Sequence, residues 1–336
     1  MNVLVTGATG FVGSHLIEQL HAGGDTVRAL VRAGSDRAFV ESLGAQVVTG
    51  DLDDTDSLHV ACEGCDVVYH SAARVEIVGS AAEFHHTTVA GTERLVAAAN
   101  EKKVRRFVHI SSCAVYPPSL LASGKEIDEF TLVTEPPRWF LYGRAKYHAE
   151  RVVRRTAAPE MEWVIIRLGY LFGPRNRTMR SYLEPVMRDS IMMIIGDGSN
   201  EMAMVYVEDA VRAIVLAGRC AEAAGKALIV CGNEHVTQRQ YFDALAEGFG
   251  IPRINKRVSY KIAFFFGWLG EWVIRSGPRR AVMRRAAIAL TGLPQRLRCT
   301  YTQELLGWRP RVSFVDGMHK AFEWYRSAYQ VETTKS

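Results

Sequence analysis

Two side chains capable of acid–base chemistry stand one helical turn apart in the stretch LYGRAKYHAERVV. Tyr142 and Lys146 are four residues apart, which places both on one face of a helix. A phenol has a pKa of roughly 10, and a neighbouring ammonium group lowers that pKa by stabilising the phenolate. Tyr142 can then exchange a proton with a substrate alcohol or carbonyl oxygen. Ser112, at the end of the run RRFVHISS, is a candidate hydrogen-bond donor to the same oxygen.

A second chemical pattern opens the chain, where MNVLVTGATGFVG joins a strand-like run to three evenly spaced glycines. Residues 2–6 are typical of a buried strand, and residues 14–24 have the apolar spacing of a helix. Gly7 permits a tight turn, Gly10 lets a pyrophosphate approach the backbone, and Gly13 lets the helix pack closely on the strand. Free N–H groups at the helix N-terminus favour the phosphates. Followed by a second strand, this pattern predicts a dinucleotide-binding site.

The end of that second strand, TVRALVR, discriminates between the two nicotinamide dinucleotides. A carboxylate at this point binds the ribose 2′-hydroxyl of NAD, whereas an arginine suits the 2′-phosphate of NADP. Val31 and Arg32 stand here, and no carboxylate does. We therefore expect NADP(H) to be favoured, with Arg32 binding the phosphate. NAD(H) stays open as an alternative, because a solvated surface arginine would look the same.

Strand and helix patterns continue to alternate along the chain. Further strand-like runs are AQVVTGDLDD, CDVVYHSAA, RRFVHISS and EWVIIRLGYLFGP, with helical segments such as GTERLVAAANEKK between them. This order predicts an α/β fold with a doubly wound parallel sheet and ligands at the carboxyl ends of its strands. We assign residues 1–170 and about 203–232 to a dinucleotide-binding domain. Residues 171–202 and 233–330 are assigned to a smaller, mainly helical substrate domain.

Composition narrows the function classes. The chain has 336 residues and a net charge of +5, which is too small to predict nucleic-acid binding. Its six cysteines show no regular framework. Cys62 and Cys65 form a CxxC without a second pair, so we interpret them as part of a helix-to-strand loop and expect no metal site. This cysteine usage, and an opening strand with no secretory signal before it, predict a reducing cytoplasmic location.

An ordered set of motifs resembles the extended short-chain dehydrogenase/reductases of the NAD-dependent epimerase/dehydratase superfamily. The motifs are TGATGFVG (6–13), GDL (50–52), HSAA (70–73), SSCAVY (111–116), YGRAK (142–146), RLGYLFGP (167–174), GDG (196–198) and VYVEDA (205–210). The resemblance implies that Ser112, Tyr142 and Lys146 are catalytic and that the nicotinamide carries the hydride. It implies a cofactor site made of Gly7, Gly10, Phe11, Val12, Gly13, Asp51, Leu52, Ser71, Ala72 and Ala73, with Tyr142 and Lys146.

The chain departs from the family pattern at positions that bear on the substrate. Thr88 stands where the family often has an asparagine, which leaves one hydrogen bond near the cofactor open. Nucleotide-sugar members usually have asparagine at the position of Tyr170 and an arginine shortly after GDG, where this chain has SNEMAM. The absence of two diphosphate ligands argues against a nucleotide sugar. Arg175 and Arg177 remain candidates to compensate.

The segment YKIAFFFGWLGEWVI (260–274) favours an apolar partner. Residues 253–298 contain eleven Lys and Arg residues and one acid, Glu271. The apolar run is shorter than the roughly twenty residues of a membrane-spanning helix. Three interpretations stay open: a core helix with basic flanks, a lid whose Phe265 or Trp268 contacts a hydrophobic substrate, and a helix docked on a membrane surface.

Within the extended family, this arrangement looks most like the 3-beta-hydroxysteroid dehydrogenase and dihydroflavonol reductase groups. We therefore expect an NAD(P)-dependent oxidoreductase that interconverts a ketone or aldehyde and an alcohol on a small or hydrophobic, sterol-, flavonoid- or lipid-like substrate. A nucleotide-sugar 4-epimerase or dehydratase with tightly bound NAD(P) is the alternative, and a non-catalytic NADP-binding sensor is the second. The direction of reaction stays open, as does the oligomeric state, for which a homodimer is one alternative.

Overall fold

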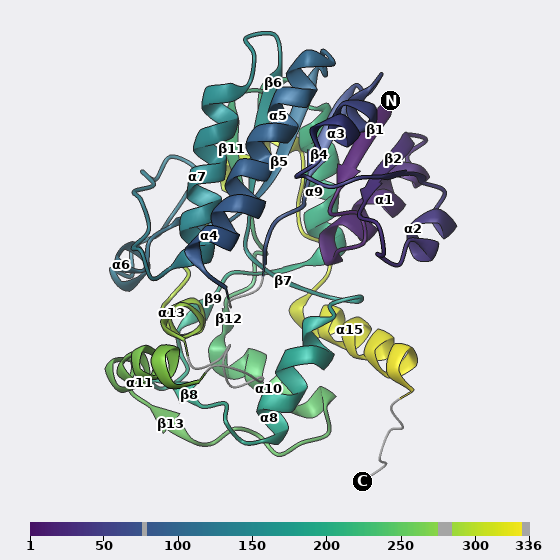
Figure 1. Ribbon diagram of the computed structural model, residues 1–336. Helices are drawn as coiled ribbons and strands as arrows, with labels where there is room; N and C mark the ends of the chain where they lie inside the picture. The colour runs from purple at the N-terminus through teal and green to yellow at the C-terminus, as the bar shows by residue number, and fades with distance from the viewer. Residues whose placement is uncertain (76–78, 275–283, 331–336) are drawn as a thin grey trace.

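A seven-stranded parallel sheet dominates the computed structural model, which describes residues 1–75, 79–274 and 284–330 (Figure 1). The strand order is β11-β6-β5-β4-β1-β2-β3, so the order reverses between β1 and β4, where such folds bind their ligands. The strands are β1 (Asn2–Thr6), β2 (Thr26–Val31), β3 (Gln46–Thr49), β4 (Val67–His70), β5 (Arg106–Ser112), β6 (Glu162–Leu168) and β11 (Lys226–Val230). Together with the helical region that follows, this sheet confirms the predicted fold class.

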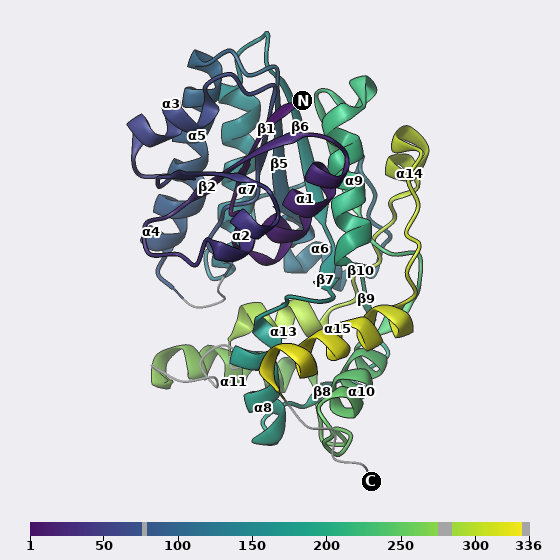
Figure 2. The ribbon, with the colours of Figure 1, turned by 90° about the vertical axis from the view of Figure 1, so that its right-hand side faces the viewer.

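Helices cover both faces of the sheet, which is why its central strands β1, β4 and β5 are buried along nearly their whole length. On one face, α1 (Phe11–Ala22) and α9 (Val207–Arg219) bury residues such as Leu16 and Ile214 (Figure 2). On the other face lie α3 (Thr55–Cys62), α5 (Gly91–Glu101) and α7 (Leu141–Thr156). Shorter helices connect these layers: α2 (Ala38–Ser42), α4 (Ala81–Phe84), α6 (Pro118–Ala122) and α14 (Thr300–Leu306).

The run EWVIIRLGYLFGP, expected to be one strand, is two strands in different sheets. β6 ends at Leu168, and the Gly169 N–H still donates to the Val230 carbonyl of the main sheet at 2.9 Å. One residue later, the Tyr170 N–H donates to the Ala203 carbonyl at 2.7 Å. β7 (Tyr170–Phe172) then pairs with β10 (Met204–Tyr206). The chain therefore crosses from the main sheet into the second part of the molecule at Gly169.

The second part is mainly helical and has a hydrophobic core of its own. That core is rich in aromatic residues and includes Tyr241, Phe242, Phe314 and Phe322. Its elements are α8 (Glu184–Arg188), β8 (Ile194–Ile195), β9 (Glu201–Met202), β12 (Val236–Thr237), α10 (Gln238–Gly248), β13 (Arg257–Val258), α11 (Tyr260–Val273), α13 (Arg285–Gly292) and α15 (Phe314–Tyr329). The proposed domain boundaries stay a prediction.

Helix α11 contradicts the interpretation of residues 260–274 as a core helix. Its buried positions are the small residues Ala263, Gly267 and Gly270, whereas Phe265 and Trp268 are 56% and 43% exposed. Arg275, Arg279 and Arg280, three of the basic residues counted in this region, lie outside the described residues. Within the described part of the chain, no helix is both long enough and apolar enough to cross a membrane.

The CxxC pair lies where the sequence placed it, between a helix and a strand. Cys62 ends α3, and the Cys65 N–H donates to the Cys62 carbonyl at 3.1 Å before β4 begins. Both thiols are buried. Burial raises the pKa of the Cys62 thiol to about 12, so it is protonated at neutral pH.

Candidate active site

Helix α7 carries the predicted proton-transfer residues to the end of β5. The Tyr142 hydroxyl is hydrogen-bonded to the Ser112 side chain, whose Oγ also accepts the Ala114 N–H at 3.1 Å. One turn further along, Lys146 is buried and its Nζ donates to the Ile110 carbonyl of β5 at 2.8 Å. The structure therefore brings Ser112, Tyr142 and Lys146 together at the carboxyl edge of the sheet.

The electrostatics of the pair differ from the expectation. Desolvation raises the pKa of Tyr142, and it is the hydrogen bond with Ser112, rather than Lys146, that opposes this shift. The physical reason is that the Lys146 ammonium is directed at the Ile110 carbonyl. Burial lowers the pKa of Lys146 to about 8, against the opposing attraction of the Glu150 carboxylate. Tyr142 is thus a proton-carrying phenol at neutral pH, and Lys146 is largely an ammonium ion.

A buried ion pair beneath the tyrosine and lysine was missed by the sequence analysis. Glu150 lies one turn beyond Lys146 and accepts the Ser111 hydroxyl at 2.7 Å. Arg167 of β6 donates to both Glu150 oxygens, at 3.0 and 2.8 Å, and to the Tyr116 hydroxyl at 3.1 Å. The sequence did contain a signal for this residue, because Glu150 follows Lys146 by four positions and so lies on the same helix face.

The glycine turn has the shape that a pyrophosphate site requires. Gly7 has a φ of +68°, and a Cβ there would lie 2.8 Å from the Ala72 nitrogen. A Cβ on Gly13 would collide with the Gly7 carbonyl, so α1 packs closely on the turn. Gly10 is exposed and precedes α1 without a side-chain cap, and Phe11 and Val12 form the first helical turn. These residues leave backbone N–H groups available at a helix N-terminus and therefore fit an anionic group.

A chain of buried hydrogen bonds supports the cofactor side of the site. His70 at the end of β4 bonds Thr6 at 2.8 Å and Thr92 at 2.9 Å. Burial lowers the pKa of His70 to about 3, so its ring is neutral. Thr88, which replaces the family's asparagine, accepts the Arg74 N–H at 3.1 Å. Thr88 therefore holds the loop that follows β4 through a backbone contact.

The other predicted cofactor residues lie at the carboxyl ends of β3 and β4, which have β1 and β2 between them in the sheet. Ser71, Ala72 and Ala73 follow β4 directly, and the Ala72 N–H donates to the Thr6 hydroxyl at 3.3 Å. Asp51 and Leu52 follow β3, and Leu52 is buried against Gly91 of α5.

Arg32 occupies the position expected of a 2′-phosphate ligand. It follows the last residue of β2 and is exposed. Among the described residues, no side chain pairs with its guanidinium group. Its neighbour Arg37 differs, because it pairs with Glu41 at 3.4 Å.

The Tyr142 ring packs against an apolar cluster. A buried cluster of Ala114, Phe140 and Ala286 packs with Trp139, Leu290 and Tyr142 itself. Ala286 and Leu290 belong to α13. The lid interpretation is wrong for Phe265 and Trp268, which face outward, since the ring that turns inward is Phe264, 5.2 Å from Trp139.

Tyr170, which stands at the position of the family's asparagine, and Arg175, one of the two candidate compensating arginines, make contacts within the protein. The Tyr170 ring lies 5.5 Å from Tyr241 in the second core, and the two hydroxyl-bearing side chains are hydrogen-bonded. Arg175 donates to the Glu18 carboxylate at 2.6 Å, and its guanidinium lies 5.3 Å from the Phe39 ring centre. Arg175 is thus held by α1 and Phe39, whereas Arg177 is exposed and stays a candidate to compensate.

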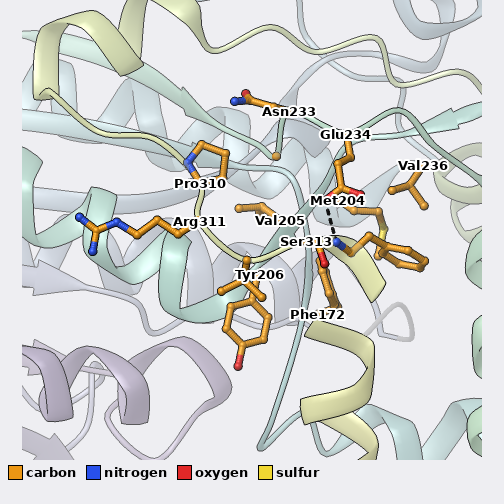
Figure 3. Close-up of a pocket in the computed structure, with 13 residues that line it drawn as sticks. Phe172, Met204, Val205, Tyr206, Asn233, Glu234, Val236, Pro310, Arg311 and Ser313 are labelled. Atoms are coloured by element: carbon orange, nitrogen blue, oxygen red, sulfur yellow. Dashed lines mark hydrogen bonds between the residues drawn. The ribbon is translucent and has the colours of Figure 1, made fainter. Parts of the chain in front are cut away.

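A hollow of about 200 Å³ lies where β7 and β10 meet the segment leading into α15 (Figure 3). Phe172 and Tyr206 line it together with Asn233 and Arg311, and the Phe314 N–H donates to Glu234 at 2.7 Å. Ser112, Tyr142 and Lys146 do not line it. This hollow is therefore separate from the candidate proton donor.

A family model described as the NAD dependent epimerase/dehydratase family matches residues 3–232. The chain belongs to this family. A nicotinamide dinucleotide is therefore its expected cofactor, and the glycine turn described above fits its phosphates.

Two of the three relatives described here match nearly the whole chain, and the third matches about three quarters of it. The 4-hydroxy-2-methyl-3-oxo-4-farnesyl-3,4-dihydroquinoline-1-oxide ketoreductase of Stigmatella aurantiaca is 29% identical over 95% of each chain. The 2-alkyl-3-oxoalkanoate reductase of Stenotrophomonas maltophilia is 28% identical over 95% of this chain and 98% of the relative. A 3 beta-hydroxysteroid dehydrogenase/Delta 5-->4-isomerase of Mycobacterium tuberculosis is 30% identical over 76% of this chain and 72% of the relative.

Solved structures share the fold. The crystal structure of gox2253 superposes with a TM-score of 0.79 at 27% identity, covering 98% of this chain and 99% of the other. The UDP-glucuronic acid 4-epimerase from Bacillus cereus, in complex with NAD, has a TM-score of 0.75 at 22% identity, covering 98% and 100%. At that identity, the epimerase supports the fold alone.

The lowered pKa of Lys146 predicts a pH-dependent stability difference. The folded chain releases this proton near pH 8, whereas the unfolded chain keeps it up to an ordinary pKa of 10.5. Between these values the unfolded state binds more protons, so the lysine makes the free energy of unfolding rise with pH. Urea unfolding at several pH values measures this effect. As the pH rises across this window, the free energy of unfolding of the wild type should increase relative to that of Lys146→Met. Equal pH slopes for the two proteins would contradict the assignment.

Proposed function

We propose that this protein is an NADP(H)-preferring oxidoreductase that interconverts a ketone and an alcohol on a hydrophobic substrate. The observation that carries the proposal is the setting of the Tyr142 hydroxyl. It is bonded to Ser112, while the ring that carries it packs against a cluster of apolar side chains. Such a wall stabilises an apolar substrate by roughly 25 cal/mol per Å² of buried apolar surface and offers little to a sugar diphosphate.

The names of three relatives support the same chemistry. They describe a ketoreductase of a farnesyl compound, a reductase of 2-alkyl-3-oxoalkanoates and a dehydrogenase of hydroxysteroids. Each acts on a ketone or an alcohol carried by a largely apolar skeleton. The nucleotide-sugar alternative has weaker support, because Tyr170 and Arg175 make contacts that do not serve a diphosphate.

Tyr142, Ser112 and Lys146 have different roles in the proposed reaction. A bound nicotinamide supplies or accepts the hydride. In the direction of reduction, Tyr142 gives its phenolic proton to the carbonyl oxygen, while Ser112 donates a hydrogen bond to that oxygen. Lys146 ties α7 to β5 through the Ile110 carbonyl and so holds the Tyr142 phenol in position. The apolar side chains around Tyr142 exclude water, and this strengthens both hydrogen bonds.

A substrate panel tests the function. Sterol, 2-alkyl-3-oxoalkanoate, flavonoid-like and UDP-sugar compounds are each incubated with NADPH or NADP, and the absorbance of the reduced nicotinamide is followed. We expect turnover with an apolar ketone or alcohol and stoichiometric cofactor change. Epimerised sugar without net cofactor change would replace the proposal by the epimerase alternative. Cofactor binding without turnover of any compound would favour the sensor.

Tyr142→Phe should lower kcat by about 10²- to 10⁴-fold, because it removes the proton donor and little else. The dissociation constant of NADPH, measured by calorimetry, should stay close to the wild-type value. Tyr147→Phe on the same helix is the matched control, since its hydroxyl bonds Arg151 instead. A Tyr142→Phe enzyme with near-normal turnover would show that another group moves the proton.

Arg32→Asp should shift cofactor preference from NADP toward NAD, because it removes a phosphate ligand and adds a ribose ligand. A preference change of about 10²-fold is expected from the loss of one charge-assisted contact and the introduced repulsion. Arg37→Asp, whose arginine already pairs with Glu41, should change the preference little. Equal wild-type affinities for the two cofactors would refute the role of Arg32.

Leu290→Asn should raise KM for an apolar ketone by about three- to tenfold, because it puts an amide into the wall beside Tyr142. The NADPH dissociation constant should not change. Leu305→Asn, a half-buried leucine on α14, provides a control for loss of stability alone. If both variants melt earlier and neither changes KM, Leu290 does not contact the substrate.

A further inference from the structure

Helix α11 is packed with its small residues inward and its large apolar residues outward. Ala263, Gly267 and Gly270 are its buried positions. A Cβ on Gly267 would lie 2.5 Å from the Ile288 Cδ1 of α13, so the two helices approach closely along this side. A surface helix of a globular protein normally buries its large apolar residues. The reversed arrangement leaves the large apolar side chains of α11 exposed.

The outward side forms one continuous surface, which we call the α11 apolar face. Its members are Ile262, Phe265, Phe266, Trp268, Leu269, Trp272 and Val273, which are 40–72% exposed. At about 100° per residue they fall within one arc of about 160°. Scattered exposed apolar residues are ordinary, but a contiguous patch of this kind marks an interaction site.

Charges around this face identify the class of partner. Arg253 and Lys256 precede the helix, Lys261 lies in its first turn, and all three are exposed. Glu271 is the one acid in residues 253–274, and Arg285 donates to its carboxylate at 2.7 Å. The face is therefore aromatic and flanked by positive charge that no exposed acid of this segment offsets. Aromatic rings beside Lys and Arg are the composition that binds an anionic lipid surface.

We propose that α11 docks flat on an anionic membrane surface. The α11 apolar face enters the boundary between headgroups and acyl chains, and Arg253, Lys256 and Lys261 bind lipid phosphates. Fourteen residues of helix extend about 21 Å, too short to cross the hydrocarbon core, so an in-plane orientation follows. A second copy of the chain suits the face less well, because a symmetric interface would bring the same cations together.

The helix that carries the docking face is connected to the candidate active site by one further helix. Helix α13 lies between α11 and the lower end of α7 (Figure 1). Through Ala286 and Leu290 it contacts the cluster that contains Tyr142. Docking would therefore set the apolar wall of the site close to lipid, from which an apolar substrate could enter. This last consequence rests on the proposed function, whereas the docking itself does not.

Co-sedimentation with vesicles, without cofactor or substrate, tests the docking. Wild type should bind phosphatidylglycerol/phosphatidylcholine vesicles, bind phosphatidylcholine alone more weakly, and dissociate as salt rises. Phe265→Ser/Trp272→Ser should lower vesicle affinity by about tenfold or more, because it removes two aromatic anchors. The matched control is Val60→Ser/Leu132→Ser, which removes side chains that are 62% and 80% exposed elsewhere and should leave binding unchanged.

The charge contribution is tested separately with Lys256→Glu/Lys261→Glu. This variant should lose the preference for phosphatidylglycerol while keeping its melting temperature, since both side chains are exposed. Absence of wild-type binding, or equal binding by all variants, would overturn the proposal. Self-association of wild type that Phe265→Ser/Trp272→Ser abolishes, without vesicle binding, would assign the face to a second copy. Because no substrate is present, these results are independent of the proposed function.

Discussion

The geometry of the candidate site depends on the contact between one face of α7 and strands β5 and β6. Three residues spaced four apart on that face each meet the sheet. Tyr142 bonds Ser112, Lys146 bonds the Ile110 carbonyl at 2.8 Å, and Glu150 pairs with Arg167 at 2.8 Å. A rotation of the helix by one residue would turn all three away together, because they share a single stripe. The position of the Tyr142 phenol therefore depends on all three contacts, including the most deeply buried one, between Glu150 and Arg167.

The most deeply buried of these contacts is an ion pair, and its burial makes it costly to break. Glu150 and Arg167 are each almost fully buried, so neither charge has water to stabilise it. Removing one partner of such a pair typically costs about 3–5 kcal/mol, because the remaining charge is left unpaired. The same carboxylate favours the charged form of Lys146, whose pKa burial brings down to about 8. One acid thus fixes the helix and keeps the neighbouring cation charged near neutral pH.

A different balance applies to the helical part of the molecule. There, close packing of Gly267 against α13 takes precedence over burial of the large side chains of α11. The result is an exposed aromatic surface on the element adjacent to the apolar wall of the site. The chain therefore presents two chemically different surfaces. Backbone N–H groups at the N-terminus of α1 fit an anion, and the side chains that pack with Tyr142 are apolar.

The sequence by itself determined those features that arise from local geometry. A glycine with positive φ, glycines that must let a helix approach, and two side chains four residues apart are properties of short stretches, so Gly7, Gly13, Tyr142 and Lys146 could be identified before any fold was known. The alternation of strands and helices likewise sufficed to predict the parallel sheet.

Tertiary structure decided the features that depend on partners distant in the chain. Arg167 meets Glu150 because β6 lies beside β5, and Lys146 faces the Ile110 carbonyl rather than the phenol because α7 packs on β5. Whether Phe265 is core or surface depends on which side of α11 packs on α13, and residue type alone predicts burial for an aromatic. Helix-to-helix fit at Gly267 reversed that expectation, because a close approach over a small residue fixes the rotation of the whole helix.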